Sequence, residues 1–504
     1  MKKLTLFLLT AAMLFSFSAC SKETPSGNIS EGEISDSSQN EASPNNTNPD
    51  HPSNDGQNFV SDNDPHNNSE SSASLRKLHS SNCWNCSDAI CYTDNGYYHV
   101  DNRGESKYDC LFYFDFATLS EVAVCSDSSC KHDNINCAAV FSHEEFFACH
   151  LFVSGEYLYC LSAPYDTDGS MSAGEGFAAE GVREHEEKRR SSLYRMKLDG
   201  TEREKLWQAD EGDIVETGVY EDGSGLWFVT KTPTAEKHEG TGAIYYHSKN
   251  RALVKYGFSE KAIVERIPLD DHNNIALDFA GACGEKFILY GQAYPGGGNI
   301  MDFMEILAPE EEVGALSPDY IDFRHKCELV FFTLDSKTKE LKEFYRGSLS
   351  EIYFGFELLG DTLYIPREDN SLFTLNIFSG EMRDIDIPGD YEFLGIFGGK
   401  LKLLHITPDW SDNAMYFADL DGSNMTKSEL INKQYGDLSI ELCAAIGDMA
   451  LVIYDEYRVP SPDNSGAYSS ITPLYALISL DDLFNGRENY LPFEMAGGEN
   501  IHAR

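Results

Sequence analysis

The sequence predicts an all-β protein, and specifically a β-propeller of seven blades, with six or eight also compatible with the spacing. Two observations support this prediction. Tyr and Phe occur 27 and 30 times among the 504 residues and recur beside Leu or Val, a composition that favours strands. A unit made of a Gly-containing turn, an aromatic strand, a variable insertion and an answering strand also repeats along the chain. Each copy spans roughly 40 to 75 residues, which is typical of propeller blades.

The two halves of each unit can be read directly from the chain. The paired segments are 94–98 with 111–115, 155–159 with 192–201, 225–228 with 252–256, 284–289 with 329–335, 360–365 with 371–376, 398–403 with 415–423, and 447–452 with 474–480. One blade alone exposes both faces of its sheet. Packing each blade between two neighbours buries these faces, so the pattern predicts a closed ring.

Two of these segments also carry a family resemblance. SLYRMKLDGTEREKL at 192–206 and AMYFADLDGSNMTKSEL at 414–430 resemble the repeats of TolB-type, WD40-like propellers and of related propeller domains in bacterial surface lipoproteins. The resemblance covers two repeats well and the other five loosely. It implies the propeller fold and hints at a role in the cell envelope, but a fold does not fix an activity.

The first twenty residues, MKKLTLFLLTAAMLFSFSAC, resemble a bacterial lipoprotein signal with its lipobox. The apolar run from Leu4 to Phe17 has about 14 residues, which is short for a spanning helix and suits a signal peptide. The resemblance implies cleavage before Cys20 and lipidation of its thiol, with palmitate among the acyl groups. Two acyl chains at ~0.8 kcal/mol per buried methylene anchor a protein durably. The alternative is an ordinary secretory signal with a chance cysteine.

These observations predict the organisation of the chain and its location. Residues 1–19 form the signal peptide, and 20–80 form a lipidated, disordered tether rich in Ser, Asn, Asp and Pro. At about 5 to 6 Å × √n, roughly 60 residues span on the order of 40 Å. The propeller covers 81–495, with a Cys-rich segment at 83–160, and 496–504 form a tail. We expect a cell-membrane protein that faces the extracytoplasmic side.

The charge of the chain limits its partners. Asp and Glu number 83 against 39 Lys and Arg, which gives a formal net charge of −44. An acidic surface repels phosphate backbones and anionic headgroups, so we expect no nucleic-acid ligand. Attachment to the membrane has to come from the lipid rather than from a basic patch.

Cysteines concentrate in one part of the chain. Of thirteen, Cys20 is assigned to lipid, and nine of the other twelve lie between Cys83 and Cys160. Cys83 and Cys86, followed by Cys91, are interpreted as a staple near the start of the propeller. The three later cysteines lie in or beside predicted strands, where buried thiols are expected; they are Cys283, Cys327 and Cys443.

The sharpest cysteine motif is C-x4-C-x-H-x4-C, formed by Cys125, Cys130, His132 and Cys137. Three thiols and an imidazole are the donors of a structural zinc site, in which four protein ligands leave no open position for catalysis. The motif also resembles a CKH-containing loop of Firmicutes lipoproteins with propeller domains. Disulfides are the alternative, because the expected compartment is extracytoplasmic and twelve is an even number. Either chemistry would staple the loop joining blades one and two.

A second candidate crosslink is a disulfide between Cys149 and Cys160. If Ser154 and Gly155 form a two-residue hairpin loop, the two cysteines lie directly opposite each other. The Cα atoms of such a hydrogen-bonded pair are about 5.5 Å apart, which a disulfide allows.

Four common sequence signatures of catalysis or cofactor binding are absent from the chain: G-x-S-x-G, H-E-x-x-H, the Walker loop and the dinucleotide fingerprint.

Insertions at 163–191, 231–251, 292–326 and 459–471 each follow the first strong strand of a blade, so we expect them on one rim of the ring, where binding loops occur. Their aromatic candidates are Tyr165, Phe177, Tyr245, Tyr246, Tyr294, Tyr320 and Tyr468.

The sequence thus favours a binding module for a protein, peptide or glycan, without catalysis. One alternative is a propeller-type glycan hydrolase or lyase with carboxylates on the axis. The other is a structural component of envelope assembly.

Overall fold

The computed structural model describes residues 74–493 with internal gaps. The gaps are 79–89, 103–107, 128, 143–147, 164–189, 211–212, 216–217, 238–243, 271–274, 299–317, 350–351, 353–354, 406, 408–413, 433–439 and 461–467. The predictions for the signal peptide, Cys20, most of the tether, Cys83, Cys86 and the C-terminal tail lie outside the described residues. Within the described part, no helix combines the length and apolar character that crossing a bilayer would require.

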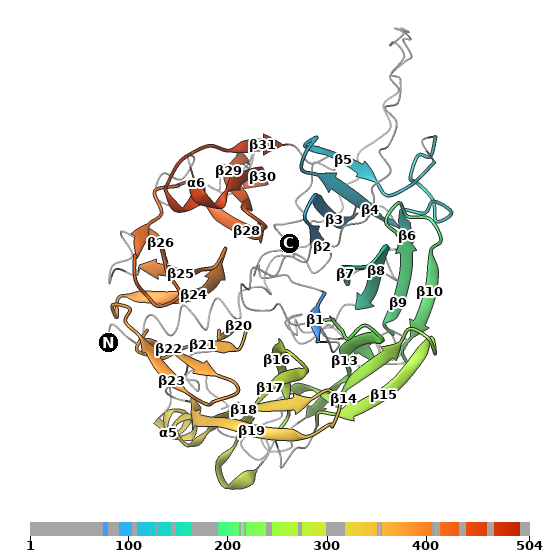
Figure 1. Cartoon of the computed structure of the whole chain (residues 1–504). Coiled ribbons are helices and arrows are strands. Elements are labelled where there is room, and N and C mark those ends of the chain that lie inside the picture. Colours follow the sequence, from blue (N-terminus) through green and yellow to red (C-terminus); the bar gives the residue numbers. More distant parts are fainter. Residues whose placement is uncertain are drawn as a thin grey trace, which may run out of the picture. The chain divides into compact units, whose positions relative to one another are not determined.

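Seven antiparallel sheets form a propeller ring, so the predicted all-β fold with seven blades is confirmed (Figure 1). Blade 1 contains β2 (Ile90–Thr93), β3 (Gly96–Asn102), β4 (Tyr108–Asp115), β5 (Ser120–Ala123) and β6 (Val140–Ser142). Blade 2 contains β7 (Ala148–Ser154), β8 (Tyr157–Ala163), β9 (Ser192–Lys197) and β10 (Glu204–Gln208). Blade 3 contains β11 (Ile214–Val215), β12 (Tyr220–Glu221), β13 (Gly225–Lys237), β14 (Ile244–Gly257) and β15 (Ala262–Pro268), with the short strand β1 (Arg76–Lys77) beside β12.

The other four blades follow in chain order. Blade 4 contains β16 (Asp278–Cys283), β17 (Lys286–Ala293), β18 (Glu328–Asp335) and β19 (Leu341–Ser348). Blade 5 contains β20 (Glu357–Leu359), β21 (Thr362–Pro366), β22 (Leu372–Asn376) and β23 (Met382–Ile385). Blade 6 contains β24 (Tyr391–Phe397), β25 (Lys400–His405), β26 (Ala414–Ala418) and β27 (Thr426–Lys427). Blade 7 contains β28 (Glu441–Ile446), β29 (Met449–Pro460), β30 (Tyr468–Ser479) and β31 (Leu491–Phe493).

Helical elements in the described part are short and lie between strands. The 3-10 turn η2 (Pro295–Gly297) and the helix α5 (Pro318–Lys326) lie between β17 and β18, and α6 (Leu480–Phe484) follows β30. The Ser479 hydroxyl caps α6 by accepting a hydrogen bond from the Asp482 amide at 3.0 Å.

The repeat seen in the sequence corresponds to the second and third strands of the blades. In blade 2, Tyr159 of β8 lies opposite Arg195 of β9, and in blade 7, Val452 of β29 lies opposite Ala476 of β30. The first strand of each blade lies toward the ring axis and the last lies at the outside (Figure 1). The aromatic strands are therefore the central strands of their sheets, which is why they carry the strongest apolar pattern.

Apolar clusters fill the spaces between neighbouring blades. Seven clusters of buried side chains each combine residues from two adjacent sheets, so every blade has a core on both of its faces. Between blades 7 and 1, the Phe114 and Phe493 rings lie 4.3 Å apart and Tyr97 is completely buried. Burying one such aromatic side chain contributes about 1.5 to 3 kcal/mol. No described strand is exchanged between blades 7 and 1, so side-chain packing closes the ring there.

One polar residue organises the start of blade 3. Asp222 accepts hydrogen bonds from the Ser224 amide at 3.0 Å, the buried Trp227 indole at 2.8 Å and the Lys255 ammonium at 2.6 Å. Burial alone would raise the pKa of Asp222, but the bonds from Lys255, Trp227 and Ser224 outweigh it and lower the pKa to about 2. The carboxylate thus fixes the turn before β13 and positions a core tryptophan.

The first prediction concerns Asp222→Asn. Charge-assisted hydrogen bonds contribute about 1.5 to 3 kcal/mol, so the free energy of unfolding should fall by that order at pH 7. The folded pKa lies below the ordinary value of 3.8, so the stabilisation is complete above pH 3.8 and is lost as the pH falls through 2. Urea unfolding of the wild type and of Asp222→Asn, at pH 7 and between pH 4 and 2, measures this difference in the free energy of unfolding.

The matched control is Asp384→Asn, at an exposed ion pair with Arg367, which should change stability little. A stability difference for Asp222→Asn that stays constant down to pH 2 would contradict the assignment.

Candidate functional site

The cysteine-rich loop interrupts the outer strand of blade 1. Cys110 near the start of β4 lies opposite Val140 of β6, whereas Phe112 lies opposite Ala123 of β5. Residues 124–139 therefore leave the sheet edge and return to it. The prediction that this loop joins blades one and two is wrong, because residues 140–142 still pair with β4 and belong to blade 1.

The structure brings the four residues of the predicted motif together. The ligand atoms of Cys125, Cys130, His132 and Cys137 all lie within 4.8 Å of one another, an arrangement that could hold a metal ion. His132 Nδ1 is 3.3 Å from Cys137 Sγ, and the His132 amide donates to Cys130 Sγ at 3.5 Å. A tetrahedral zinc site with Zn–S bonds of about 2.3 Å separates its sulfur ligands by roughly 3.8 Å, so the donors need little rearrangement.

Local geometry explains why the loop turns inward. His132 adopts a left-handed conformation with φ of 53°, which reverses the chain between Cys130 and Cys137. Asp127 accepts hydrogen bonds from the Ser129 amide and hydroxyl at 2.9 and 2.7 Å, which form a tight turn and lower the pKa of Asp127. The loop is thus shaped by its own backbone and side chains.

The site rests on an apolar floor and on blade 2. Cys137 is buried beside Cys110 and Val140, and burial raises its pKa to about 12. Arg203, which follows the turn of blade 2 after β9, donates to the carbonyl oxygens of Ala138 at 3.1 Å and Val140 at 2.7 Å. Its guanidinium also lies 4.7 Å from the centre of the Phe141 ring. The loop therefore fastens the outer edges of blades 1 and 2 together.

The predicted position of Cys149 directly opposite Cys160 is wrong. The register of β7 and β8 places Cys160 opposite Leu151 and Cys149 opposite Ser162. The hairpin turn consists of Gly155 and Glu156, one position later than predicted, because Gly155 takes the left-handed conformation with φ of 60°.

Burial raises the pKa of Cys91 to about 12 and that of Cys327 to about 11. Cys327 is buried in the interface of blades 4 and 5 and Cys443 in that of blades 7 and 1, which confirms the prediction of buried thiols at these two positions. Cys283 is partly buried beside the cluster that contains Cys327.

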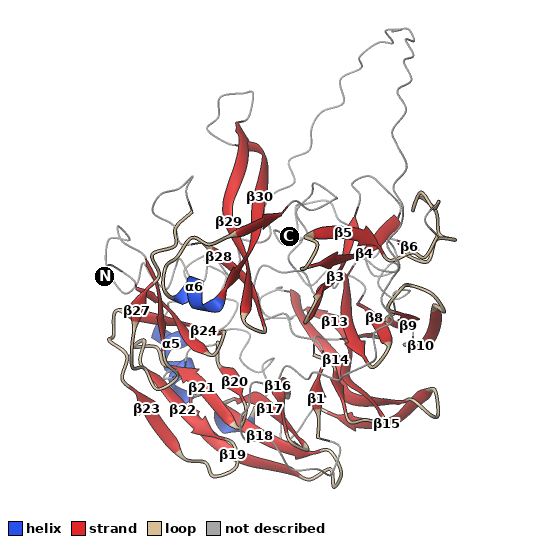
Figure 2. Cartoon of the chain, turned by 45° about the horizontal axis from the view of Figure 1, so that its top comes forward, coloured by secondary structure: helices blue, strands red, loops and turns tan. Residues whose placement is uncertain are grey.

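The described strands that flank the predicted insertions are β8 and β9, β13 and β14, β17 and β18, and β29 and β30. Each pair consists of the two central strands of its blade, so these connections begin and end on one face of the ring. Figure 2 shows the long β29–β30 hairpin projecting beyond its blade. Of the aromatic candidates, Tyr165 and Phe177 lie outside the described residues, and the side chains of four others are not described: Tyr245, Tyr246, Tyr320 and Tyr468.

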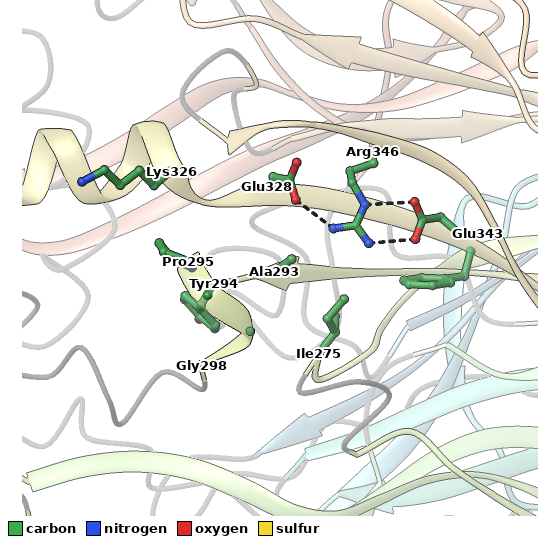
Figure 3. A pocket seen from close by; sticks show the side chains of 12 residues that line it. Ile275, Ala293, Tyr294, Pro295, Gly298, Lys326, Glu328, Glu343 and Arg346 are labelled. Atoms are coloured by element: carbon green, nitrogen blue, oxygen red, sulfur yellow. Dashed lines mark hydrogen bonds and ion pairs between the residues drawn. The ribbon is translucent and has the colours of Figure 1, made fainter.

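A cavity of about 540 Å³ lies on this face at blade 4 (Figure 3). It is lined by residues of β17, η2, α5, β18 and β19 and of the segments next to β16 and η2, namely Ile275, Ala293, Tyr294, Pro295, Gly296, Gly297, Gly298, Lys326, Glu328, Phe332, Glu343 and Arg346. The Tyr294 ring stacks on Phe323 of α5, with centroids 6.1 Å apart. Tyr294 is thus the aromatic candidate that the structure places in a described cavity.

Charged side chains form one wall of the cavity. The Arg346 guanidinium donates to Glu343 through two bonds, at 2.9 and 2.8 Å, and to Glu328 at 2.8 Å. The bonds that Arg346 donates to Glu343 and Glu328 raise its pKa further. No sequence motif indicated these three residues. Glu343 and Arg346 lie three residues apart in β19, and the pairing of β18 with β19 brings Glu328 beside them.

The first strands carry acidic residues toward the axis. Burial raises the pKa of Glu357 in β20 and of Glu392 in β24. Glu357 accepts a hydrogen bond from the Ile396 amide of β24 at 2.5 Å, which links blades 5 and 6. Glu221 in β12 accepts a hydrogen bond from the Ser154 hydroxyl of β7 at 2.8 Å.

No family model matches the chain, and no curated protein sequence matches it. Among solved structures it is similar to a prolyl endopeptidase, with 11% identity over 77% of this chain and a TM-score of 0.39. This chain spans only 44% of that enzyme. It is similar to TolB from Acinetobacter baumannii, with 11% identity, coverage of 81% and 79% of the two chains, and a TM-score of 0.28.

The β-propeller domain of the trilobed protease from Pyrococcus furiosus is also similar, with 8% identity, coverage of 82% of this chain and 99% of that chain, and a TM-score of 0.37. These likenesses concern the propeller fold. The class that the structure defines is thus a seven-bladed β-propeller with a cysteine- and histidine-rich loop on its first blade.

Proposed function

We propose that this protein is a lipid-anchored, extracytoplasmic binding module that captures a protein, peptide or glycan on the insertion-bearing face of its propeller. The cavity at blade 4 is the observation that supports this most directly, because it combines Tyr294 with the charged wall of Glu328, Glu343 and Arg346. Concave sites with an apolar or aromatic surface and a few placed polar groups are typical of ligand pockets.

Catalysis on the axis is the less favoured function. A glycan hydrolase needs two acidic side chains that face one substrate, one of them with a raised pKa. Glu357 has a raised pKa, but the Ile396 amide occupies one of its oxygens. Glu221 is held by Arg76 at 2.5 Å and by Ser154 at 2.8 Å. These interactions give Glu357 and Glu221 a structural role, which supports binding rather than chemistry at these two carboxylates.

The cysteine loop is proposed to hold a structural zinc ion. Cys125, Cys130, His132 and Cys137 would supply three thiolates and one imidazole, the donor set that suits zinc. A disulfide would use two of the thiols and leave the third thiol and the imidazole unused. Convergence of all four donor atoms therefore favours the metal over the disulfide alternative.

The anchoring proposal rests on the sequence of residues 1–20. A lipidated Cys20 would hold the propeller at the membrane surface, and residues 20–80 would keep it some distance away. The net charge of −44 then acts against direct adsorption of the propeller to anionic lipid.

The second prediction tests ligand binding. The protein without its signal peptide is used in a pull-down from its own envelope fraction and on a glycan array. Tyr294→Ala should weaken capture of the ligand about tenfold or more, because it removes the aromatic wall of the cavity. Phe378→Ala, at an exposed aromatic residue in the turn after β22, should leave capture unchanged. No ligand in either assay, or equal loss in both variants, counts against the proposed site.

The third prediction tests the metal. The purified protein should contain one equivalent of zinc by elemental analysis, and Cys130→Ser should remove it and raise the protease sensitivity of the loop. Cys283→Ser, at a thiol in the interface of blades 4 and 5, should keep the zinc. A metal-free protein in which thiol titration finds these cysteines oxidised would establish disulfides instead.

The fourth prediction tests the anchor. In the native host, Cys20→Ser should move the protein from the membrane fraction to the soluble extracytoplasmic fraction, because no acyl chain can be attached. Ser21→Ala, next to the modified residue, should leave it in the membrane. Retention of the Cys20→Ser protein in washed membranes would refute lipid anchoring.

A further inference from the structure

A short segment that the sequence analysis assigned to the tether is part of the ring. β1 pairs antiparallel with β12, with Arg76 opposite Glu221 and Lys77 opposite Tyr220. The Leu78 amide donates to the Val219 carbonyl at 2.9 Å, and the Leu75 amide donates to the Gly284 carbonyl of blade 4 at 2.7 Å. Figure 1 shows β1 on the inner side of the ring. Among the described sheets, only blade 3 has an extra strand at its inner edge.

The two leucines that flank β1 enter different cores. Leu75 is 8% exposed and belongs to the apolar cluster between blades 3 and 4, beside Tyr220 and Phe287. Leu78 packs against the cluster between blades 2 and 3, which includes Phe152. One five-residue stretch, 74–78, therefore contributes to two neighbouring interfaces at once.

Arg76 extends the segment to blade 2. Its guanidinium bonds to Glu221 at 2.5 Å and to the Ser154 hydroxyl at 3.4 Å, and Ser154 itself donates to Glu221 at 2.8 Å. Ser154 ends β7, so this triangle joins β1, the inner strand of blade 3 and the inner strand of blade 2. Glu221 and Ser154 are largely buried, whereas the Arg76 side chain is 46% exposed, so water reaches the ion pair from one side.

Lys77 is the second charged residue of β1, and its side chain keeps solvent contact. Partial burial lowers the pKa of Lys77, and the charge of Glu357 acts in the opposite direction. The contacts of the segment reach blades 2, 3 and 4.

We propose that residues 74–78 are an internal clasp that holds blades 2 to 4 together from the axis. This inference does not depend on the proposed ligand, metal or lipid anchor.

The experiment is hydrogen exchange, resolved by peptide, on the mature chain and on Leu75→Ala/Arg76→Gln. Backbone amides of β7, β12 and β16 should exchange about tenfold faster in the variant, because the inner strands of blades 2 to 4 lose a shared partner. Peptides from β28 in blade 7 should be unchanged. Arg383→Gln, which breaks an exposed ion pair with Glu381 in blade 5, is the control and should leave all these peptides unchanged.

Two outcomes would overturn the proposal. One is faster exchange confined to residues 74–78, which would mean that the segment pairs with blade 3 but does not stabilise the neighbouring blades. The other is an equal increase in all seven blades, which would indicate general destabilisation rather than a clasp. If the double variant does not fold, Arg76→Gln alone is compared with Arg76→Lys, which keeps the charge and should restore part of the protection.

Discussion

Side-chain packing between neighbouring sheets is the interaction on which the rest of this structure depends. A four-stranded blade has two apolar faces and cannot bury either one by itself. Seven apolar clusters, one for each pair of neighbouring blades, bury both faces of every blade in the ring. At the junction of the first and last blades, the contact of Phe114 with Phe493 helps to bury the facing apolar surfaces, and no described strand is exchanged there. The aromatic content of the chain is a direct consequence, because aromatic side chains fill the wide gaps between sheets.

Polar contacts also hold the packed ring together at its outer edge and at its axis. At the outside, the cysteine- and histidine-rich loop bridges the two halves of the outer strand of blade 1 and is held by Arg203 of blade 2. On the axis, residues 74–78 connect the inner strands of blades 2 to 4. Both elements are short, and both act by linking pieces of sheet that are already packed.

The four donor residues of the loop and the blade count could be predicted because their signals are local. Cys125, Cys130, His132 and Cys137 lie within one short loop, so their convergence requires only a turn at His132. The central strands repeat an aromatic pattern that stays recognisable in the sequence whatever the length of the insertion between them. The predicted register of Cys149 with Cys160 was wrong for a local reason too. Gly155 starts the turn rather than ending it, and this one-position change makes Ser162 the partner of Cys149.

By itself, the sequence determined the all-β class, the central strands of seven blades and the donor set of the cysteine loop, because short-range periodicity and spacing encode each of these. Only the tertiary structure decided that the outer strand of blade 1 resumes after the loop, that Arg346 meets Glu328 and Glu343, and that Arg76 reaches Ser154. These contacts join residues whose proximity depends on how strands pair and on how blades close around an axis. No local pattern in the chain encodes that closure, since it arises when the sheets pack together.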